Sequence, residues 1–244
     1  MHWLLISDLD NTWVGDQIAL EKLQHHLADR RDSFYLVYAT GRSFASAKAL
    51  QQTVGLMEPN YWVTAVGSEI YDGQGLDQAW ANYLSENWQR ETIQAIADQY
   101  PELTPQSPSE QNPWKISYHF DPQADPQAIE AIKQQLRQTD LPVQVIFSSG
   151  KDVDFLPQRS NKGNATRYLQ QHLQLSGEKT LVCGDSGNDI SLFETDSRGV
   201  IVNNAQPELL TWHQQYGEDR HYLATSSHAA GILEAIAHFN LLTT

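Results

Sequence analysis

Short apolar runs alternate with amphipathic segments in the first 80 residues of the chain and again after residue 160. A short apolar run predicts a buried strand, and apolar residues three or four positions apart predict a helix. Strands that alternate with helices are typical of an α/β fold with a doubly wound parallel sheet. We expect strands at 4–7, 34–39, 61–66, 180–183 and 199–202, and helices at 16–29, 44–54, 162–173, 192–193, 207–216 and 228–239.

The pattern changes near residue 80, where the regular alternation stops. A polar, proline-rich stretch from Pro101 to Pro113 lies inside this part of the chain. We expect an inserted α+β cap domain over residues 80–158 and a Rossmann-like core domain formed by residues 1–79 and 159–244. Within the insertion the pattern predicts helices around 88–100 and 129–136, and extended segments at 114–120, 143–147 and 152–156.

The composition limits the classes of function. The chain has 244 residues, of which 40% are hydrophobic, and this is enough for a substantial core. Its net charge of −14 opposes binding to nucleic acid and to anionic membranes, so an anionic substrate needs a local cation. The single cysteine, Cys183, excludes an intramolecular disulfide. There is no charged-then-apolar leader and no apolar run near the ~20 residues of a membrane span, so we expect a cytoplasmic enzyme. We also expect it to be a monomer.

Two carboxylates follow the first apolar run. Asp8 and Asp10 lie two residues apart, so on an extended backbone both point to the same side. Carboxylates that close repel each other unless a cation or a proton lies between them. This arrangement favours a divalent metal with hard oxygen ligands and one carboxylate acting as a nucleophile. The alternative is a simple turn or helix cap, for which Asp and Asn are common.

Three further elements lie at the ends of predicted strands or at the start of a predicted helix. Thr40 and Gly41 offer a hydroxyl and an unobstructed N–H group for phosphate oxygens, and Arg42 follows them. Lys162 places a compact cation at a helix start. The segment 184–189 contains carboxylates at 185 and 189 that suit Mg²⁺. Taken singly, the lysine fits a solvated surface residue, the arginine a surface charge and the acidic segment a capped turn.

The order of these four elements resembles the haloacid-dehalogenase-like phosphohydrolase superfamily. The resemblance implies Asp8 as nucleophile, and Asp10 as the acid for the leaving alcohol and then the base for water. Thr12 is expected to orient Asp10, and Arg42 to steady the phosphate loop. The phosphate-binding residues are then Thr40, Gly41, Arg42 and Lys162, and Mg²⁺ is held by Asp8, Asp185, Asp189 and the backbone carbonyl of Asp10.

Three segments of the chain, 112–119, 148–157 and 156–163, resemble the sucrose-phosphate phosphatase family, in particular its short cyanobacterial forms. The resemblance implies Mg²⁺-dependent hydrolysis of sucrose 6-phosphate, the final step of sucrose synthesis, beneath a cap that selects the sugar. A sugar needs several polar side chains that each bind one hydroxyl group. We expect these to be Lys115, His119, Ser149, Lys151, Asp152 and Glu69.

Several other readings stay open on the sequence. The core motifs do not separate sucrose 6-phosphate from trehalose 6-phosphate or mannosyl-3-phosphoglycerate as the substrate. A phosphomutase would return the phosphoryl group to a sugar instead of water. A non-catalytic module would bind a sugar phosphate or a sucrose-phosphate synthase, which is also a candidate partner of the enzyme, but such a module has no need of the second carboxylate, Asp10.

Overall fold

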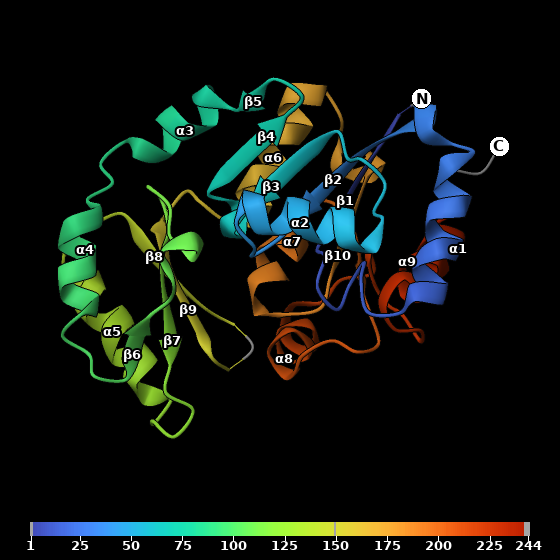
Figure 1. Ribbon diagram of the computed structural model, residues 1–244. Helices are drawn as coiled ribbons and strands as arrows, with labels where there is room; N and C mark the ends of the chain where they lie inside the picture. The colour runs from blue at the N-terminus through green and yellow to red at the C-terminus, as the bar shows by residue number, and fades with distance from the viewer. Residues whose placement is uncertain (1, 149, 242–244) are drawn as a thin grey trace.

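The computed structural model describes residues 2–148 and 150–241, which form two lobes with one β-sheet each (Figure 1). In the larger lobe the strand order is β12-β11-β10-β1-β2-β3-β4-β5. The strands from β12 to β3 run parallel, whereas β4 and β5 are antiparallel additions at one edge. Their bounds are β1 (Trp3–Ser7), β2 (Phe34–Ala39), β3 (Tyr61–Thr64), β4 (Glu69–Asp72), β5 (Gly75–Leu76), β10 (Thr180–Gly184), β11 (Arg198–Ile201) and β12 (His221–Leu223).

Helices cover both faces of this sheet, which confirms the predicted doubly wound architecture. Alternate residues of each strand enter opposite cores: Leu5 belongs to one hydrophobic cluster, and Leu4 and Ile6 to the other. The first cluster contains residues of α1 (Gln17–Ala28), α2 (Phe44–Val54) and α9 (His228–His238). The second contains residues of α3 (Gln78–Ser85), α6 (Lys162–Leu173), α7 (Ile190–Phe193) and α8 (Pro207–Tyr216).

The strand predicted over 61–66 ends earlier, at Thr64. Ala65 and Val66 adopt left-handed conformations, with φ of 50° and 60°. Their N–H groups donate to the carbonyl oxygens of Arg42, at 2.8 Å, and Thr40, at 3.0 Å. The chain therefore turns against the predicted phosphate loop, and the antiparallel β4 follows. Three short strands do not follow from the sequence pattern: β4, β5 and β12, which have four, two and three residues.

The smaller lobe is an antiparallel sheet of order β6-β7-β9-β8 with two helices on one face. Tyr118 and Phe155 point into the hydrophobic cluster under these helices, whereas Ser117 and Asp154, their neighbours along each strand, are outside it. The open face of the sheet is therefore polar. The elements are β6 (Leu103–Pro105), β7 (Ile116–Phe120), β8 (Val143–Ser148), β9 (Asp152–Pro157), α4 (Arg90–Ala97) and α5 (Gln127–Arg137).

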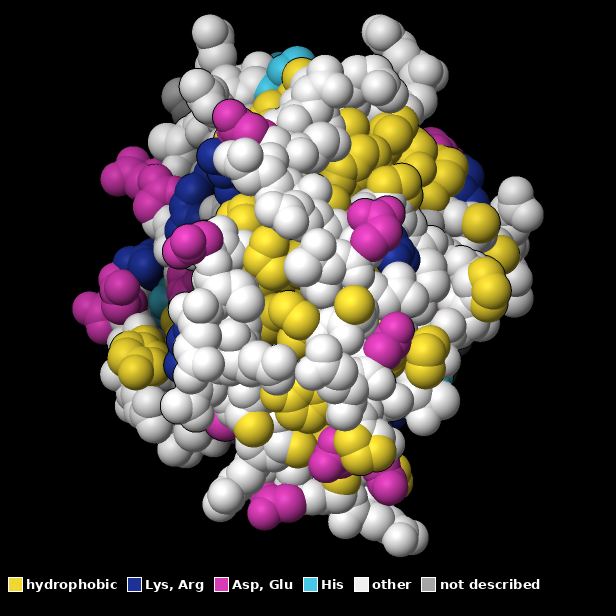
Figure 2. Space-filling view, turned by 90° about the vertical axis from the view of Figure 1, so that its left-hand side faces the viewer, with side chains coloured by type: hydrophobic (Ala, Val, Ile, Leu, Met, Phe, Trp, Pro, Cys, Tyr) yellow, Lys and Arg dark blue, Asp and Glu magenta, His cyan; other side chains and the backbone are white. Residues whose placement is uncertain are grey.

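The predicted domain limits near residues 80 and 158 stay a prediction. Trp80 and Leu84 of α3 pack in a hydrophobic cluster of the larger lobe, which favours a limit after this helix. The outer side of the smaller lobe, in Figure 2, has apolar side chains among polar ones and no broad basic patch. Among the residues that the structure describes, no helix combines the length and the apolar content needed to cross a membrane.

Candidate active site

The side chains of Asp8 and Lys162 meet at the carboxyl end of β1. Parallel pairing of β1 with β2 and β10 brings the residues after these three strands to one edge of the sheet. Lys162 begins α6 and is fully buried, and its Nζ donates to Asp8 Oδ1 at 2.7 Å and to Asp189 Oδ1 at 2.6 Å. The lysine is thus a buried cation shared by two carboxylates, not the solvated surface residue of the alternative reading.

Asp185 completes a cluster of three buried carboxylates with Asp8 and Asp189. One oxygen from each of the three lies within 4.8 Å of the others. Both oxygens of Asp189 already accept hydrogen bonds, Oδ1 from Lys162 and Oδ2 from the N–H groups of Asp185 and Ser186 at 3.0 Å each. Asp189 is therefore engaged in holding the lysine and its own loop.

The local sequence explains how Asp189 fits beneath the strand end. A Cβ atom on Gly184 would lie 2.5 Å from the Cβ of Asp189, so only glycine allows this approach. Thr12 differs from expectation: its hydroxyl donates to Asp185 Oδ1 at 3.1 Å and so orients Asp185 instead of Asp10.

The cluster carries more negative than positive charge. Burial, with the neighbouring carboxylates, raises the pKa of Asp8 to about 7 and that of Asp185 to about 8, although Lys162 opposes both shifts. Burial lowers the pKa of Lys162, but the attraction of Asp189 and Asp8 outweighs it and raises the pKa above its ordinary value. Three carboxylates against one ammonium group leave a deficit of positive charge that a divalent cation would fill.

Asp10 is held by a different cation. Arg42 forms a bidentate ion pair with it, with Nε donating to Oδ2 and Nη2 to Oδ1, both at 2.7 Å. The backbone N–H of Arg42 donates to the hydroxyl of the buried Thr40 at 3.1 Å, which fixes the loop that presents Gly41. The arginine thus binds both oxygens of the Asp10 side chain in this structure.

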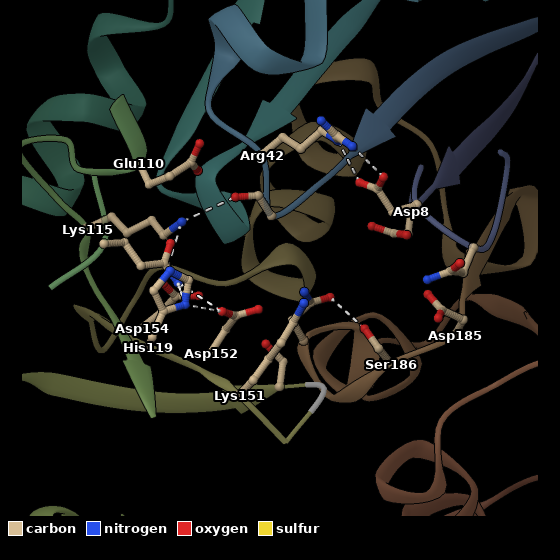
Figure 3. A pocket seen from close by; sticks show the side chains of 16 residues that line it. Asp8, Arg42, Glu110, Lys115, His119, Lys151, Asp152, Asp154, Asp185 and Ser186 are labelled. Atoms are coloured by element: carbon tan, nitrogen blue, oxygen red, sulfur yellow. Dashed lines mark hydrogen bonds and ion pairs between the residues drawn. The ribbon is translucent and has the colours of Figure 1, made fainter. Parts of the chain in front are cut away.

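A cavity of about 470 Å³ lies between the two lobes and opens onto these groups (Figure 3). Its volume is within the range of about 300–1,000 Å³ usual for small-molecule sites. Of the predicted site residues that the structure describes, four do not line it: Thr40, Lys162 and Asp189, which are buried behind the site, and Glu69. The predicted site residues that line it are Asp8, Asp10, Gly41, Arg42, Lys115, His119, Lys151, Asp152 and Asp185.

Lys115 links the two lobes. It lies just before β7 and is 3% exposed, and its Nζ donates to the carbonyl oxygen of Gly41 at 3.2 Å. The same Nζ is 3.5 Å from Asp154 Oδ1, which also accepts a hydrogen bond from Ser117 at 2.5 Å. A buried cap cation therefore touches the phosphate loop of the core directly.

A second polar group on the cap sheet is more exposed. Asp152 Oδ1 accepts from Gln106 Nε2 at 3.0 Å and lies 3.2 Å from His119 Nδ1. The side chain of His119 is 60% exposed, and Lys151 is also exposed, at the tight connection between β8 and β9. Ser149, another predicted sugar ligand, lies outside the described residues.

Glu69 is buried in the core sheet and does not line the cavity. It is 8% exposed in β4, and its Oε2 accepts from the Thr64 hydroxyl at 3.0 Å. Burial raises its pKa. The expectation that it binds sugar came from its place after a predicted strand end, but the strand reverses there and carries the side chain out of the cavity lining. We therefore leave Glu69 out of the proposed sugar site.

Several lining residues were absent from the predicted site. Asp154 alternates with Asp152 along β9, so the period of two could have identified it. Gln106 and Glu110 come from the proline-rich stretch, which has no periodicity to place them. The other lining residues that were missed are Asn11, Ser148, Ser186 and Asn188.

Comparison with known proteins gives relatives over the full chain. The model of the family Sucrose-6F-phosphate phosphohydrolase matches residues 1–240. Sucrose-phosphatase 1 of Nicotiana tabacum is 38% identical over 98% of this chain, which spans 59% of that relative's length. Mannosylfructose-phosphate phosphatase of Agrobacterium fabrum is 32% identical, with 98% of this chain and 97% of the relative covered.

A solved structure agrees over its whole length. The X-ray structure of the sucrose-phosphatase of Synechocystis sp. PCC6803 in complex with sucrose and phosphate is 70% identical in sequence, with a TM-score of 0.99 and full coverage of both chains. The fold described above is therefore that of an experimentally determined relative.

Proposed function

Because this chain belongs to the Sucrose-6F-phosphate phosphohydrolase family, we propose that it hydrolyses the phosphate ester of a phosphorylated disaccharide, with sucrose 6-phosphate as its substrate. One observation carries the proposal: a single cavity extends from Asp8, which Lys162 holds from behind, to the polar face of the cap sheet. The first side suits phosphoryl transfer, and the second suits a ligand with many hydroxyl groups.

Asp8 acts as the nucleophile in this proposal. One carboxylate oxygen of Asp8 is hydrogen-bonded to Lys162, which leaves the other to attack phosphorus. The bond from phosphorus to the sugar oxygen breaks, and that oxygen leaves with a proton from Asp10. Water then attacks the acyl phosphate, Asp10 takes up a proton from that water, and phosphate and the free carboxylate of Asp8 are regenerated.

Arg42 lies between Asp10 and the place for the incoming phosphate. Its guanidinium group forms a bidentate pair with Asp10 and lines the cavity. A substrate phosphate offers the guanidinium group an equally good partner. We therefore assign Arg42 to the incoming phosphate, and its move from Asp10 to the phosphate releases that carboxyl group for its role as acid and base.

The residues present fit a divalent cation, as Mg²⁺ was predicted from the sequence. Asp8 and Asp185 offer carboxylate oxygens close together in a buried site with excess negative charge. With the carbonyl of Asp10 they would hold the ion, whereas Asp189 supports Lys162 and the loop. When bound, the ion neutralises charge on the phosphate and on Asp8.

The cap side of the cavity carries the choice of sugar. Lys115, His119, Lys151 and Asp152 are proposed to bind hydroxyl groups, and Gln106 and Asp154 join them because they line the same wall. The relative named for mannosylfructose phosphate makes another phosphorylated disaccharide the second candidate. A synthase partner, a monomeric state and a cytoplasmic location stay predictions.

The test is a phosphate-release assay with Mg²⁺ on sucrose 6-phosphate, mannosylfructose phosphate and trehalose 6-phosphate. We expect the highest kcat/KM on sucrose 6-phosphate, and loss of activity with a chelator. Transfer of the phosphoryl group between sugars without phosphate release would support a phosphomutase instead. Binding of sucrose 6-phosphate without any turnover would support the non-catalytic alternative.

A further inference from the structure

The tip of the loop that carries Asp8 and Asp10 is tied to the distant C-terminal part of the chain. The carbonyl oxygen of Asn11 accepts two hydrogen bonds, from Asn204 Nδ2 at 2.7 Å and from His228 Nδ1 at 2.8 Å. Asn11 is the residue after Asp10 and lines the cavity. Asn204 follows β11, and His228 begins α9, so two separate elements converge on one peptide group.

The orientation of both donors is set by their partners. The backbone N–H of His228 donates to Asn204 Oδ1 at 2.9 Å, so the other end of this amide must be the NH₂ group that faces Asn11. A carbonyl oxygen can only accept, so the His228 ring carries its proton on Nδ1. In each of the three hydrogen bonds between these residues, a donor therefore faces an acceptor.

The backbone is left-handed at both residues that meet here. Asn11 and His228 have φ of 61° and 53°, in a region that asparagine tolerates but that is uncommon for a histidine. Gly15, with φ of 143°, leaves the space for the imidazole, because a Cβ there would lie 2.4 Å from the His228 ring. The uncommon conformation of His228 persists only where surrounding contacts impose it.

Hydrogen bonds within the loop hold its base, whereas the hydrogen bonds to its tip, Asn11, come from distant parts of the chain. The carbonyl oxygen of Leu9 accepts from the N–H groups of Trp13, at 3.0 Å, and Val14, at 2.8 Å. Asn11 lies on the exposed outer side of this turn. The side chain of Asp10 is 46% exposed, so packing alone does not fix it.

We propose that Asn204 and His228 are positioning residues for Asp10, acting through the carbonyl of Asn11. This inference rests on the proposed function, because it concerns the residue assigned as acid and base there. The two hydrogen bonds fix the left-handed turn at Asn11 and with it the direction of the Asp10 side chain and carbonyl. Neither residue lines the cavity, so neither is a catalytic residue.

Three variants and one control test the two hydrogen bonds. His228→Asn keeps an amide N–H donor at the same number of bonds from Cα as Nδ1, on a residue that tolerates positive φ. His228→Gly removes the donor and relieves the strain. Asn204→Asp keeps the acceptor for the His228 N–H but removes the donor to Asn11. His238→Ala, at the far end of α9, is the control for loss of a histidine.

Kinetics on two leaving groups give the first measurement. Nitrophenolate leaves without a proton, whereas a sugar alkoxide needs one from Asp10. His228→Gly and Asn204→Asp should lower kcat on sucrose 6-phosphate by about 10- to 100-fold, the usual effect of removing such a supporting hydrogen bond. Their KM should stay within about twofold, and p-nitrophenyl phosphate should be affected much less. His228→Asn and His238→Ala should resemble the unaltered enzyme.

Mn²⁺ binding to the substrate-free enzyme, followed by titration calorimetry, gives a measurement that needs no activity. We expect Mn²⁺ affinity about tenfold lower in His228→Gly and Asn204→Asp only. Unchanged kinetics and Mn²⁺ affinity in these two variants would overturn the proposal, and so would equal losses with both leaving groups or in His228→Asn. An unaltered enzyme without phosphatase activity refutes the proposed function alone, since the Mn²⁺ titration still tests the tie to Asn11.

Discussion

The two walls of the cavity differ in how their charges are held. Directly behind the core wall, Lys162 and Asp189 are fully buried, and Lys162 Nζ lies 2.6 Å from Asp189 Oδ1. Asp8, which lines the cavity and pairs with the same Nζ, is 5% exposed. On the cap wall, His119 is 60% exposed and lies 3.2 Å from Asp152. Rearranging buried, hydrogen-bonded charges costs more free energy than rearranging exposed ones. The core wall therefore suits a fixed reaction, and the cap wall suits recognition that can change between relatives.

Lys115 shares features of both walls, because it belongs to the cap but is as buried as the charged residues of the core. It touches the phosphate loop and a cap carboxylate at once. We therefore expect its replacement to combine the effects seen on the two walls.

The largest effect is expected at the core wall. Asp8→Asn should lower turnover by at least about 10⁴-fold, because an amide cannot form the acyl phosphate. The fold should stay intact, as checked by circular dichroism and thermal unfolding. Asp140→Asn, the same exchange at an exposed position, is the control. Retained activity in Asp8→Asn would remove this residue from the nucleophile role.

The next effect is expected at Lys115. Lys115→Met leaves Asp154 as a buried carboxylate without its cation, which should cost about 3 kcal/mol of stability. Adding Asp154→Asn should restore most of that loss in denaturant unfolding. The double variant should still hydrolyse sucrose 6-phosphate about 100-fold more slowly, by analogy with other supporting contacts. Full recovery of activity in the double variant would mean that Lys115 acts only through stability.

The core wall should also control the response to pH. The pKa values of Asp8 and Asp185, about 7 and about 8, lie above their ordinary value of 3.8. Between pH 3.8 and about 7 the metal-free folded chain therefore binds protons that the unfolded chain has lost, so its unfolding free energy falls as pH rises, by at most about 1.4 kcal/mol per pH unit for each group.

Affinity for Mg²⁺ should rise as pH rises, because the Asp8 and Asp185 carboxyl groups must lose their protons before they bind the ion. Mg²⁺ should raise the unfolding temperature slightly at pH 5.5 and much more at pH 8, as followed by scanning fluorimetry with and without a chelator. Asp185→Asn should weaken both the fall of the unfolding free energy with pH and the rise of Mg²⁺ stabilisation with pH. A stabilisation by Mg²⁺ that is the same at the two pH values would contradict the assignment of this cluster to the metal.

The smallest effect is expected at Glu69, which lies outside both walls. Glu69→Gln should change KM for sucrose 6-phosphate by no more than about twofold, because its carboxyl group is buried against Thr64 and not in the cavity. Lys151→Ala, on the cap wall, is the positive control in the same assay. A large rise in KM for Glu69→Gln would return this residue to the sugar site.

The core wall could be predicted from the sequence more completely than the cap wall. Asp8, Lys162 and Asp185 sit directly at strand ends or a helix start, so periodicity places them, and the topology of a parallel sheet brings them together. Gln106 and Glu110 come from an irregular stretch, where no period indicates which side chain faces the cavity. The pair of Arg42 with Asp10 and the tie of His228 to Asn11 join residues far apart in sequence, and only the folded chain reveals them.

The most direct test is phosphate release from sucrose 6-phosphate by the unaltered enzyme, set beside p-nitrophenyl phosphate and beside Asp8→Asn, all with Mg²⁺. We predict rapid release from the sugar phosphate and no release above background from the variant. We also predict poor turnover of the small ester, because we expect the hydroxyl groups of the disaccharide to drive closure of the cap. Equal rates on the two esters, or release that survives in Asp8→Asn, would contradict the account.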